Sequence, residues 1–258
     1  MDFSNVADNL RESFRVLASG RATGEVRELR GVSIASAGVT FQMFNAAFLS
    51  APVASDAELE QRILLASLHF QSRGQEWAYW VCDDWLKATV RSRSHKIFGK
   101  FGLRHSVDLP GMVAEGLAPP RRRLPHPEIR RVCDRSTQEA FCTVGSICFN
   151  VPFSWFREVF ETNSVWDHFA GYVAYVGAEP VSTAAIVING GAAGVYNVAT
   201  IPGHQRHGYG EAVVRHALDT ARSEHGIQRT ILQSTKAGYA LYERMGYRTV
   251  TNVSVYST

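Results

Sequence analysis

Apolar residues recur along the first part of the chain with the spacing of two amphipathic helices. Over residues 3–19 and 55–74 they return every three or four positions, and a glycine closes each segment. Ser55 stands before the second segment and Glu58 follows three residues later, which predicts a capping box at the start of that helix. The two segments therefore predict helices separated by a stretch with a shorter apolar period.

The shorter period predicts strands around these helices. We expect two strands within residues 25–50 around a turn at Ser36–Gly38, an aromatic strand over 76–86, a helix over 91–102, and a strand over 103–117 broken at Pro110.

The second half predicts a longer alternation of strands and helices. We expect a strand at 128–134, helical material over 137–162, a hairpin over 171–190 turning at Gly177–Pro180, a strand at 193–201, a helix from Gly210 to Glu224, a strand at 228–235, a helix at 237–246 and a strand at 247–257. This order predicts an α/β fold with a mixed sheet, of the α+β kind.

A proline-rich segment separates the two halves. The stretch LAPPRRRLPHPE contains four prolines and the consecutive arginines Arg121, Arg122 and Arg123. Proline at this density ends both helices and strands, which favours a solvated linker over an anion or nucleic-acid patch. We therefore expect a domain over 1–115, a linker over 116–127 and a second domain over 128–258.

The two halves share a sequence echo. IFGKFGLRHSVDL, from Ile97, resembles LYERMGYRTVTNV, from Leu241, and each follows the order helix, glycine, strand. Repeated order of this kind indicates duplication of one structural unit.

Composition narrows the class of protein. The chain has 258 residues, 45% hydrophobic and 20% charged, with a net charge of +3, which favours a globular protein and argues against nucleic acid as a partner. Its four cysteines show no metal-binding spacing, so we expect no metal and a reducing, cytoplasmic location. No signal peptide and no apolar run of about 20 residues is found, so we expect no membrane partner.

The segment HQRHGYGEAVVRHAL, residues 204–218, places Gly208 and Gly210 at the start of a predicted helix. Bare backbone at a helix N-terminus makes a cradle for an anion, most often a phosphate. The alternative is a turn that merely permits tight packing of strand and helix. A Walker A loop is excluded because no Lys-Ser or Lys-Thr follows, and a dinucleotide fingerprint because Val213 replaces its third glycine.

The pattern of Gln205, Gly208 and Gly210, preceded by Pro202, resembles the pyrophosphate loop of the GNAT superfamily of acyl-CoA-dependent N-acyltransferases. LYERMGY resembles the late helix of that family. The resemblance covers about residues 128–258. With the echo, it implies two tandem GNAT-like domains of which the N-terminal one is degenerate, and acetyl-CoA as cosubstrate.

The resemblance also implies site residues. Tyr242 matches the general acid, Ser234 stands where many members have an asparagine that bonds the pantetheine, and Ala237 matches a small residue facing the cofactor. The remaining cofactor-binding positions are the strand Val198, Ala199 and Thr200, and the loop Gln205, Arg206, His207, Gly208, Tyr209, Gly210 and Glu211.

The chemistry explains why such a site uses a phenol. An amine attacks the thioester and a thiolate leaves; a thiol has a pKa of about 8.5 and a phenol of about 10, so a nearby Tyr can donate the proton. The alternative for Tyr242 is a packed aromatic beside Leu241 and Met245.

Four residues before the hairpin are candidates for the general base: Glu158, Glu161, Asp167 and His168. Cys148 lies in an apolar stretch that can line the acceptor cleft, without a partner to activate it as a nucleophile.

The first half has lost these features. Its counterpart of the glycine loop, PVASDAELEQ, has no glycine and carries Asp56 and Glu58, which would repel a diphosphate, and Phe98 stands opposite Tyr242. We expect this half to bind no coenzyme A and to wall the acceptor cleft or stabilise its partner. An unrelated α/β domain is the alternative.

These features predict an enzyme that transfers acetyl from acetyl-CoA to a primary amine of a small molecule or peptide by direct attack in a ternary complex, as a monomer or homodimer. A non-catalytic acyl-CoA sensor is the alternative. A third possibility, an RNA- or protein-associated module acting through Arg121–Arg123, is disfavoured by the small net charge.

Overall fold

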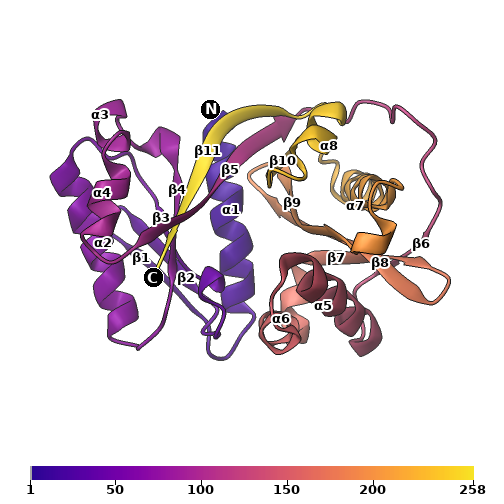
Figure 1. Ribbon diagram of the computed structural model, residues 1–258, viewed down its shortest axis with the longest axis horizontal. Helices are drawn as coiled ribbons and strands as arrows, with labels where there is room; N and C mark the ends of the chain where they lie inside the picture. Colours follow the sequence, from indigo (N-terminus) through magenta and orange to yellow (C-terminus); the bar gives the residue numbers. More distant parts are fainter. Residues whose placement is uncertain (1) are drawn as a thin grey trace.

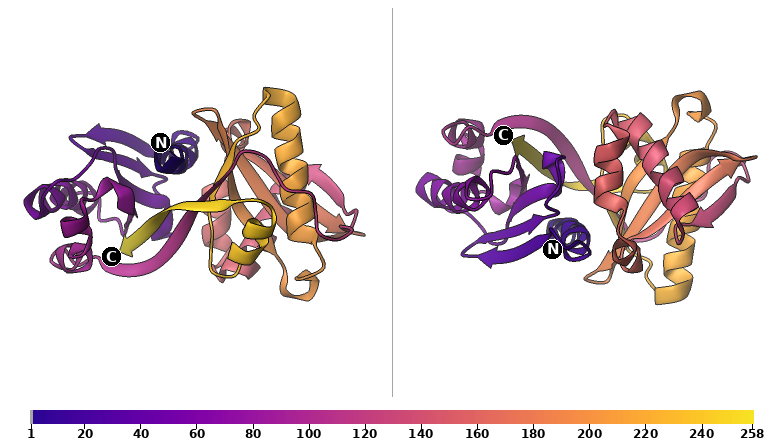
Figure 2. Two further views of the ribbon diagram at one scale, coloured as in Figure 1. Left: turned by 90° about the horizontal axis from the view of Figure 1, so that it is seen from above. Right: turned by 90° about the horizontal axis from the view of Figure 1, so that it is seen from below.

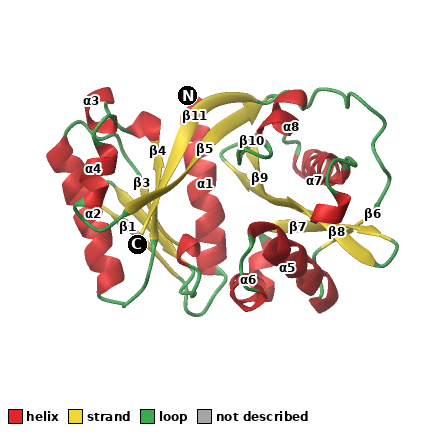
Figure 3. Cartoon of the chain, viewed as in Figure 1, coloured by secondary structure: helices red, strands yellow, loops and turns green. Residues whose placement is uncertain are grey.

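One mixed sheet runs through both halves of the chain (Figures 1 and 3). The computed structural model describes residues 2–258. Its eleven-stranded sheet has the order β1-β2-β3-β4-β11-β5-β10-β9-β8-β7-β6. The predicted α/β fold with a mixed sheet is therefore confirmed.

The first half contributes five strands of this sheet and four α-helices. Its elements are α1 (Asp2–Ser19), β1 (Glu25–Leu29), β2 (Val32–Ser36), β3 (Asn45–Leu49), α2 (Asp56–Gln71), β4 (Ala78–Cys82), α3 (Ala88–Arg91), α4 (Ser94–Gly99) and β5 (Arg104–Ala114), with short 3-10 turns η1 (Gln42–Phe44) and η2 (Asp83–Trp85).

The second half contributes the other six strands. Its elements are β6 (Glu128–Arg131), α5 (Arg135–Phe149), α6 (Phe153–Phe160), η3 (Asn163–Asp167), β7 (Ala170–Val176), β8 (Glu179–Asn189), β9 (Ala192–Thr200), η4 (Pro202–His204), α7 (Tyr209–His225), β10 (Thr230–Gln233), α8 (Tyr239–Arg244) and β11 (Arg248–Ser257).

The two halves repeat one topology and exchange their last strands. In each, an antiparallel meander leads through a crossover helix to a parallel strand: β3 pairs with β4 through α2, and β9 with β10 through α7. The last strand of the first half, β5, pairs with β10, and the last strand of the second half, β11, pairs with β4; β5 and β11 also pair with each other. Figure 2 shows these two long strands joining the halves.

The sequence echo corresponds to a repeated turn. Gly102 and Gly246 both have positive φ, +78° and +99°. The amide of Leu103 bonds the carbonyl of Phe98 at 3.3 Å, and that of Tyr247 bonds the carbonyl of Tyr242 at 3.0 Å. Glycine suits both positions because other residues are strained at such φ values. The predicted duplication is thus borne out in backbone geometry.

Helices cover both faces of the sheet. Strand side chains alternate between faces: Ile34 joins the apolar cluster beneath α2 and α4, whereas its neighbour Ala35 joins the cluster beneath α1. In the second half α7 and α8 cover the first face, and α5 and α6 cover the second. Helix α1 lies on the second face between the halves and contacts strands of both (Figure 1).

Asn9 joins α1 to the second half. Its side chain is fully buried, donates to the carbonyls of Val187 and Ala192 at 3.2 and 3.1 Å, and accepts from the hydroxyl of Tyr196 at 2.7 Å. One amide side chain therefore ties the N-terminal helix to β8 and β9.

Asn9→Ala is expected to lower the free energy of unfolding by about 2 kcal/mol, because it leaves the buried Tyr196 hydroxyl without an acceptor. Urea unfolding of the full chain measures this. Asn5→Ala is the control, since Asn5 lies on the same helix and makes no hydrogen bond through its side chain to other residues of 2–258. Equal stability of the two variants would contradict the assignment.

Several predictions about local structure were wrong. Residues 25–50 form three strands, because Gly31, with φ +76°, makes a tight turn within what was predicted as one strand. The helix predicted over 91–102 is shorter than expected, because α4 covers only Ser94–Gly99, whereas the helical material predicted over 137–162 is confirmed as α5 and α6, which the left-handed residue Asn150 separates. The Ser55 side chain accepts from the Glu58 amide as predicted, but Glu58 accepts from the Ala54 amide rather than completing the box.

The predicted break at Pro110 was also wrong, because β5 is continuous through it. The carbonyl of Pro110 accepts from the Ser234 amide at 2.9 Å, just where the pairing of β5 with β10 ends at Gln233. The amide that proline lacks would point to the same side, so its loss interrupts no ladder. Proline is therefore tolerated in β5 at the point where its pairing with β10 ends.

Candidate active site

Strands β9 and β10 part in the middle of the second half. They pair only through Ala193–Val195 and Thr230–Leu232. Beyond this point Asn197 has φ +47° and the register of β8 against β9 shifts, which is a β-bulge. Val198–Thr200 then stay paired with β8 alone, which leaves a β9 edge that β10 does not cover. Below, these three residues are called the free edge of β9.

The glycine loop follows this edge and leads into α7. Gly208 caps the helix with φ +97°, and Arg206 has φ +63°. Within residues 2–258, no hydrogen bond is formed by the backbone amides of the segment from Arg206 to Glu211. These unpaired donors lie at the positive end of a 17-residue helix, which suits a diphosphate.

Each glycine also has a packing reason. A Cβ on Gly210 would lie 3.1 Å from Oγ1 of Thr200, so its absence lets α7 approach the free edge of β9. A Cβ on Gly208 would lie 3.0 Å from Pro125 of the linker. Tight packing and bare amides therefore coexist, and the two explanations of these glycines do not exclude each other. Nearby, Gln205 donates to the carbonyl of Thr200 at 3.1 Å.

Tyr242 lies on α8 with only 7% of its surface exposed, and its hydroxyl makes no hydrogen bond within residues 2–258. Burial raises the pKa of its phenol, so the proton is retained at neutral pH. A Cβ on Gly238 would lie 3.0 Å from the Tyr242 ring and 3.4 Å from Oγ of Ser234. The fold therefore places Ser234 and Tyr242 together, directly after β10 parts from β9.

Two other predicted cofactor positions are placed differently. The hydroxyl of Ser234 is fully buried and donates to the carbonyl of Thr235 at 2.8 Å, so it is already engaged. Ala237 is exposed in the turn before α8. Of this pair, Ala237 alone presents free surface.

The general-base candidates are not gathered at this site. Asp167 and His168 line a hollow of about 640 Å³ together with Glu224 and His225. Those two residues end α7, and a helix of this length spans about 25 Å, so the hollow lies far from the free amides. Glu158 accepts from the Thr40 amide at 3.1 Å, and Glu161 lies 3.9 Å from Arg21.

Cys148 comes close to the free edge of β9. Its half-buried thiol lies close enough to the backbone of Thr200 to be affected by it. Burial raises the pKa of this thiol, which keeps it protonated and argues against a nucleophile. Sequence reasoning missed this proximity. It also missed the bulge at Asn197, although asparagine is a residue that readily adopts positive φ.

The first half has no matching opening. Its parallel strands β3 and β4 pair over three residues and are then joined again by a bridge between Val53 and Leu86. The Val53 amide donates to the Trp85 carbonyl at 2.7 Å, and the Lys87 amide donates to the Val53 carbonyl at 3.0 Å. In the second half the strand edge beside β9 is open. In the first half the residues after β3 and β4 close the equivalent position.

The residues that replace the glycine loop and Tyr242 in the first half make contacts within the chain. Asp56 pairs with Arg93 at 2.8 Å. A hydrogen bond from the Ala54 amide holds the pKa of Glu58 below its usual range. Phe98 stacks on Tyr256 with ring centroids 3.9 Å apart. The start of α2 thus carries two carboxylates, whose charge would repel a diphosphate.

We expect one coenzyme A per chain, because within residues 2–258 only the second half presents unpaired amides beside an open strand edge. Calorimetric titration of the full chain measures the stoichiometry. A second site of comparable affinity, retained when the second-half loop is disabled, would contradict this expectation.

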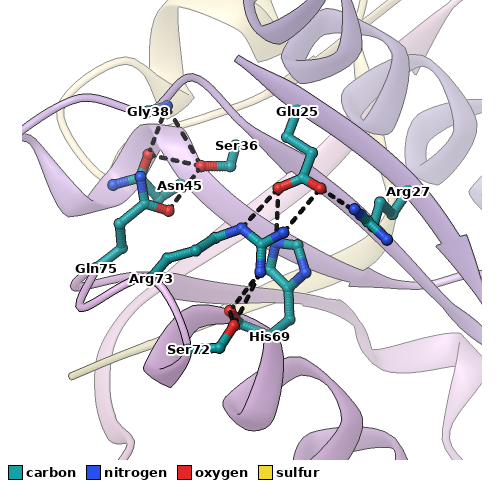
Figure 4. Close-up of polar contacts among 9 residues, drawn as sticks. All are labelled: Glu25, Arg27, Ser36, Gly38, Asn45, His69, Ser72, Arg73 and Gln75. Atoms are coloured by element: carbon teal, nitrogen blue, oxygen red, sulfur yellow. Dashed lines mark hydrogen bonds and ion pairs between the residues drawn. The ribbon is translucent and has the colours of Figure 1, made fainter. Parts of the chain in front are cut away.

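A separate polar cluster in the first half is structural (Figure 4). Arg73 binds Glu25 through two nitrogens at 2.7 and 2.9 Å, and Arg27 and His69 face the same carboxylate. Burial opposes ionisation of Glu25, but the arginine hydrogen bonds outweigh it and lower its pKa. The carboxylate is saturated, so this cluster ties β1 to the end of α2.

Comparison with known proteins identifies the class of fold to which the whole chain is similar. The whole chain resembles a GCN5-related N-acetyltransferase from Kribbella flavida, with 16% identity over 97% of this chain and 95% of that one and a TM-score of 0.72. It also resembles a tandem GNAT protein from the clavulanic acid biosynthesis pathway, with 9% identity over 99% and 95% of the two chains and a TM-score of 0.55. A functionally unknown conserved protein from Staphylococcus epidermidis ATCC 12228 gives 14% identity over 91% and 94%, with a TM-score of 0.67.

The chain therefore has the tandem GNAT fold. Residues 138–247 match the acetyltransferase (GNAT) family, so the second half contains a domain of that family, as the sequence predicted. No curated protein matches the chain.

Two further observations concern other classes of site. Within residues 2–258, no group of three or more His, Cys, Asp or Glu side chains could hold a metal ion. Over the same residues, none of the helices combines the length and apolar character that crossing a membrane requires.

Proposed function

We propose that the second half transfers an acetyl group from acetyl-CoA to a primary amine of a small molecule or peptide. The observation that carries this proposal is the run of unpaired amides from Arg206 to Glu211 beside the free edge of β9, in a domain of the GNAT family. The amides fit a diphosphate, and the open edge fits an extended arm that adds to the sheet like a strand.

The chain's residues have distinct parts in this reaction. The α7 amides hold the diphosphate, and the backbone of Val198–Thr200 orients the pantetheine arm. Bound acetyl-CoA supplies a thioester that a neutral amine can attack. Tyr242 donates its phenol proton to the leaving sulfur as the carbon–sulfur bond breaks, the new amide loses its extra proton to solvent, and Tyr242 regains a proton from solvent.

An acceptor screen tests the proposal. Full-length protein and acetyl-CoA are incubated with a panel of small amines and peptides, and free thiol and acetylated product are both measured. We expect at least one amine to give equal amounts of each. Binding of acetyl-CoA without thiol release across the panel would favour the alternative, a non-catalytic acyl-CoA sensor.

A further inference from the structure

The linker between the halves is fixed against the glycine loop. The Ala118 amide donates to the carbonyl of Met245 at 2.9 Å, and Arg215 of α7 donates to the carbonyl of Ala118 at 2.8 Å. Leu124 and Pro125 lie where a Cβ on Gly208 would meet them, at 3.3 and 3.0 Å. Arg121, Arg122 and Arg123 are exposed, as expected of a solvated linker, but the segment around them is held by α7 and the end of α8.

The contact brings one linker arginine onto the loop. Nη2 of Arg122 donates to the carbonyl of Arg206 at 2.7 Å, and it lies 3.7 Å from where a Cβ on Gly208 would be. A guanidinium has five N–H donors, and this is the one bond that Arg122 makes within residues 2–258. Neither Arg122 nor Arg206 forms an ion pair with a carboxylate of those residues.

We infer that Arg122 belongs to the coenzyme A site and positions the loop that binds the diphosphate. This inference rests on the proposed function of the α7 amides. By holding the Arg206 carbonyl, Arg122 fixes the left-handed turn that starts the run of free amides. Its remaining donors add an unpaired positive charge beside the dianionic group, and charge-assisted bonds of this kind are among the strong ones. The linker thereby becomes a binding element of the second half.

Calorimetric titration with coenzyme A and with dephospho-coenzyme A tests this inference. Arg122→Ala is expected to weaken both ligands by about 10-fold or more, because a charge-assisted contact to the diphosphate is lost. The neighbouring Arg123→Ala is the matched control and is expected to bind as the wild type does. Raising the salt concentration should weaken the wild type more than Arg122→Ala, a difference that a purely structural role would not produce.

The outcomes separate this inference from the proposed function. If the wild type binds coenzyme A and Arg122→Ala binds it with the same affinity, the role of Arg122 is overturned while the proposed function stands. Loss confined to coenzyme A would move the contact to the 3′-phosphate and overturn the diphosphate assignment. A wild type that binds neither ligand would overturn the proposed function as well. Should Arg122→Ala unfold, Arg122→Gln, which keeps a donor for the Arg206 carbonyl without the charge, carries the same test.

Discussion

Tyr242→Phe is expected to lower kcat by about 10²-fold or more and to leave the affinity for acetyl-CoA nearly unchanged. General acids typically contribute 10²–10⁴ in rate. The charge on the sulfur develops only as the bond breaks, so the loss falls on the transition state rather than on ground-state binding. Stability should hardly change, because the phenol makes no hydrogen bond within residues 2–258 that the substitution would break. Steady-state kinetics and cofactor titration measure the two effects separately.

Tyr239→Phe is the matched control for this substitution. Tyr239 lies on the same helix, and its hydroxyl is already engaged by the Thr249 hydroxyl at 3.0 Å. We expect it to keep wild-type kcat. Full activity of Tyr242→Phe across the pH range would mean that the thiolate leaves unaided or that another group protonates it, and Tyr242 would then be a packed aromatic residue.

Gly210→Asp is expected to weaken acetyl-CoA binding by about 10²-fold or more. Its Cβ would lie 3.1 Å from Oγ1 of Thr200, and its carboxylate would lie among the free amides of α7. Two like charges about 4 Å apart near a protein surface repel by about 4 kcal/mol, which is enough for this loss. Calorimetric titration measures the affinity, and thermal unfolding verifies that the variant is folded.

Two glycine variants separate charge from shape. Gly203→Asp puts the same charge on the same loop, where a Cβ meets no neighbour within 4 Å, and we expect a smaller loss. Gly210→Ala adds a methyl group against the Thr200 side chain without charge, and we expect an intermediate effect. Unchanged affinity in a folded Gly210→Asp variant would show that the diphosphate does not lie on these amides.

Much of the fold could be predicted because hydrophobic periodicity reports local structure. The long, strongly periodic segments that form α1, α2 and α7 were predicted correctly, and the echo around Gly102 and Gly246 indicated the repeat. The exchange of β5 and β11 could not be predicted, because each strand has the same pattern whichever half it pairs with. The predicted break at Pro110 was wrong for a related reason. The amide that proline lacks interrupts a strand only where a partner strand would accept from that amide.

The sequence predicted some parts of the candidate site and not others. The sequence motifs identified Gly208, Gly210 and Tyr242. The two glycines form a recognisable loop pattern, and Tyr242 belongs to a helix whose sequence resembles that of the family. The free edge of β9 depends on the bulge at Asn197 and on the early end of the β10 pairing, which are relations between strands. The contacts of Arg122 and Cys148 join segments far apart in the sequence, so periodicity carries no signal of them.

The most direct test of this account is a crystal structure of the full chain grown with coenzyme A. The account predicts one coenzyme A per chain, with its diphosphate on the amides of Arg206–Glu211 and its pantetheine arm along the free edge of β9, and with Tyr242 near the sulfur. A diphosphate bound elsewhere on the chain, or a ligand between β3 and β4 of the first half, would contradict it.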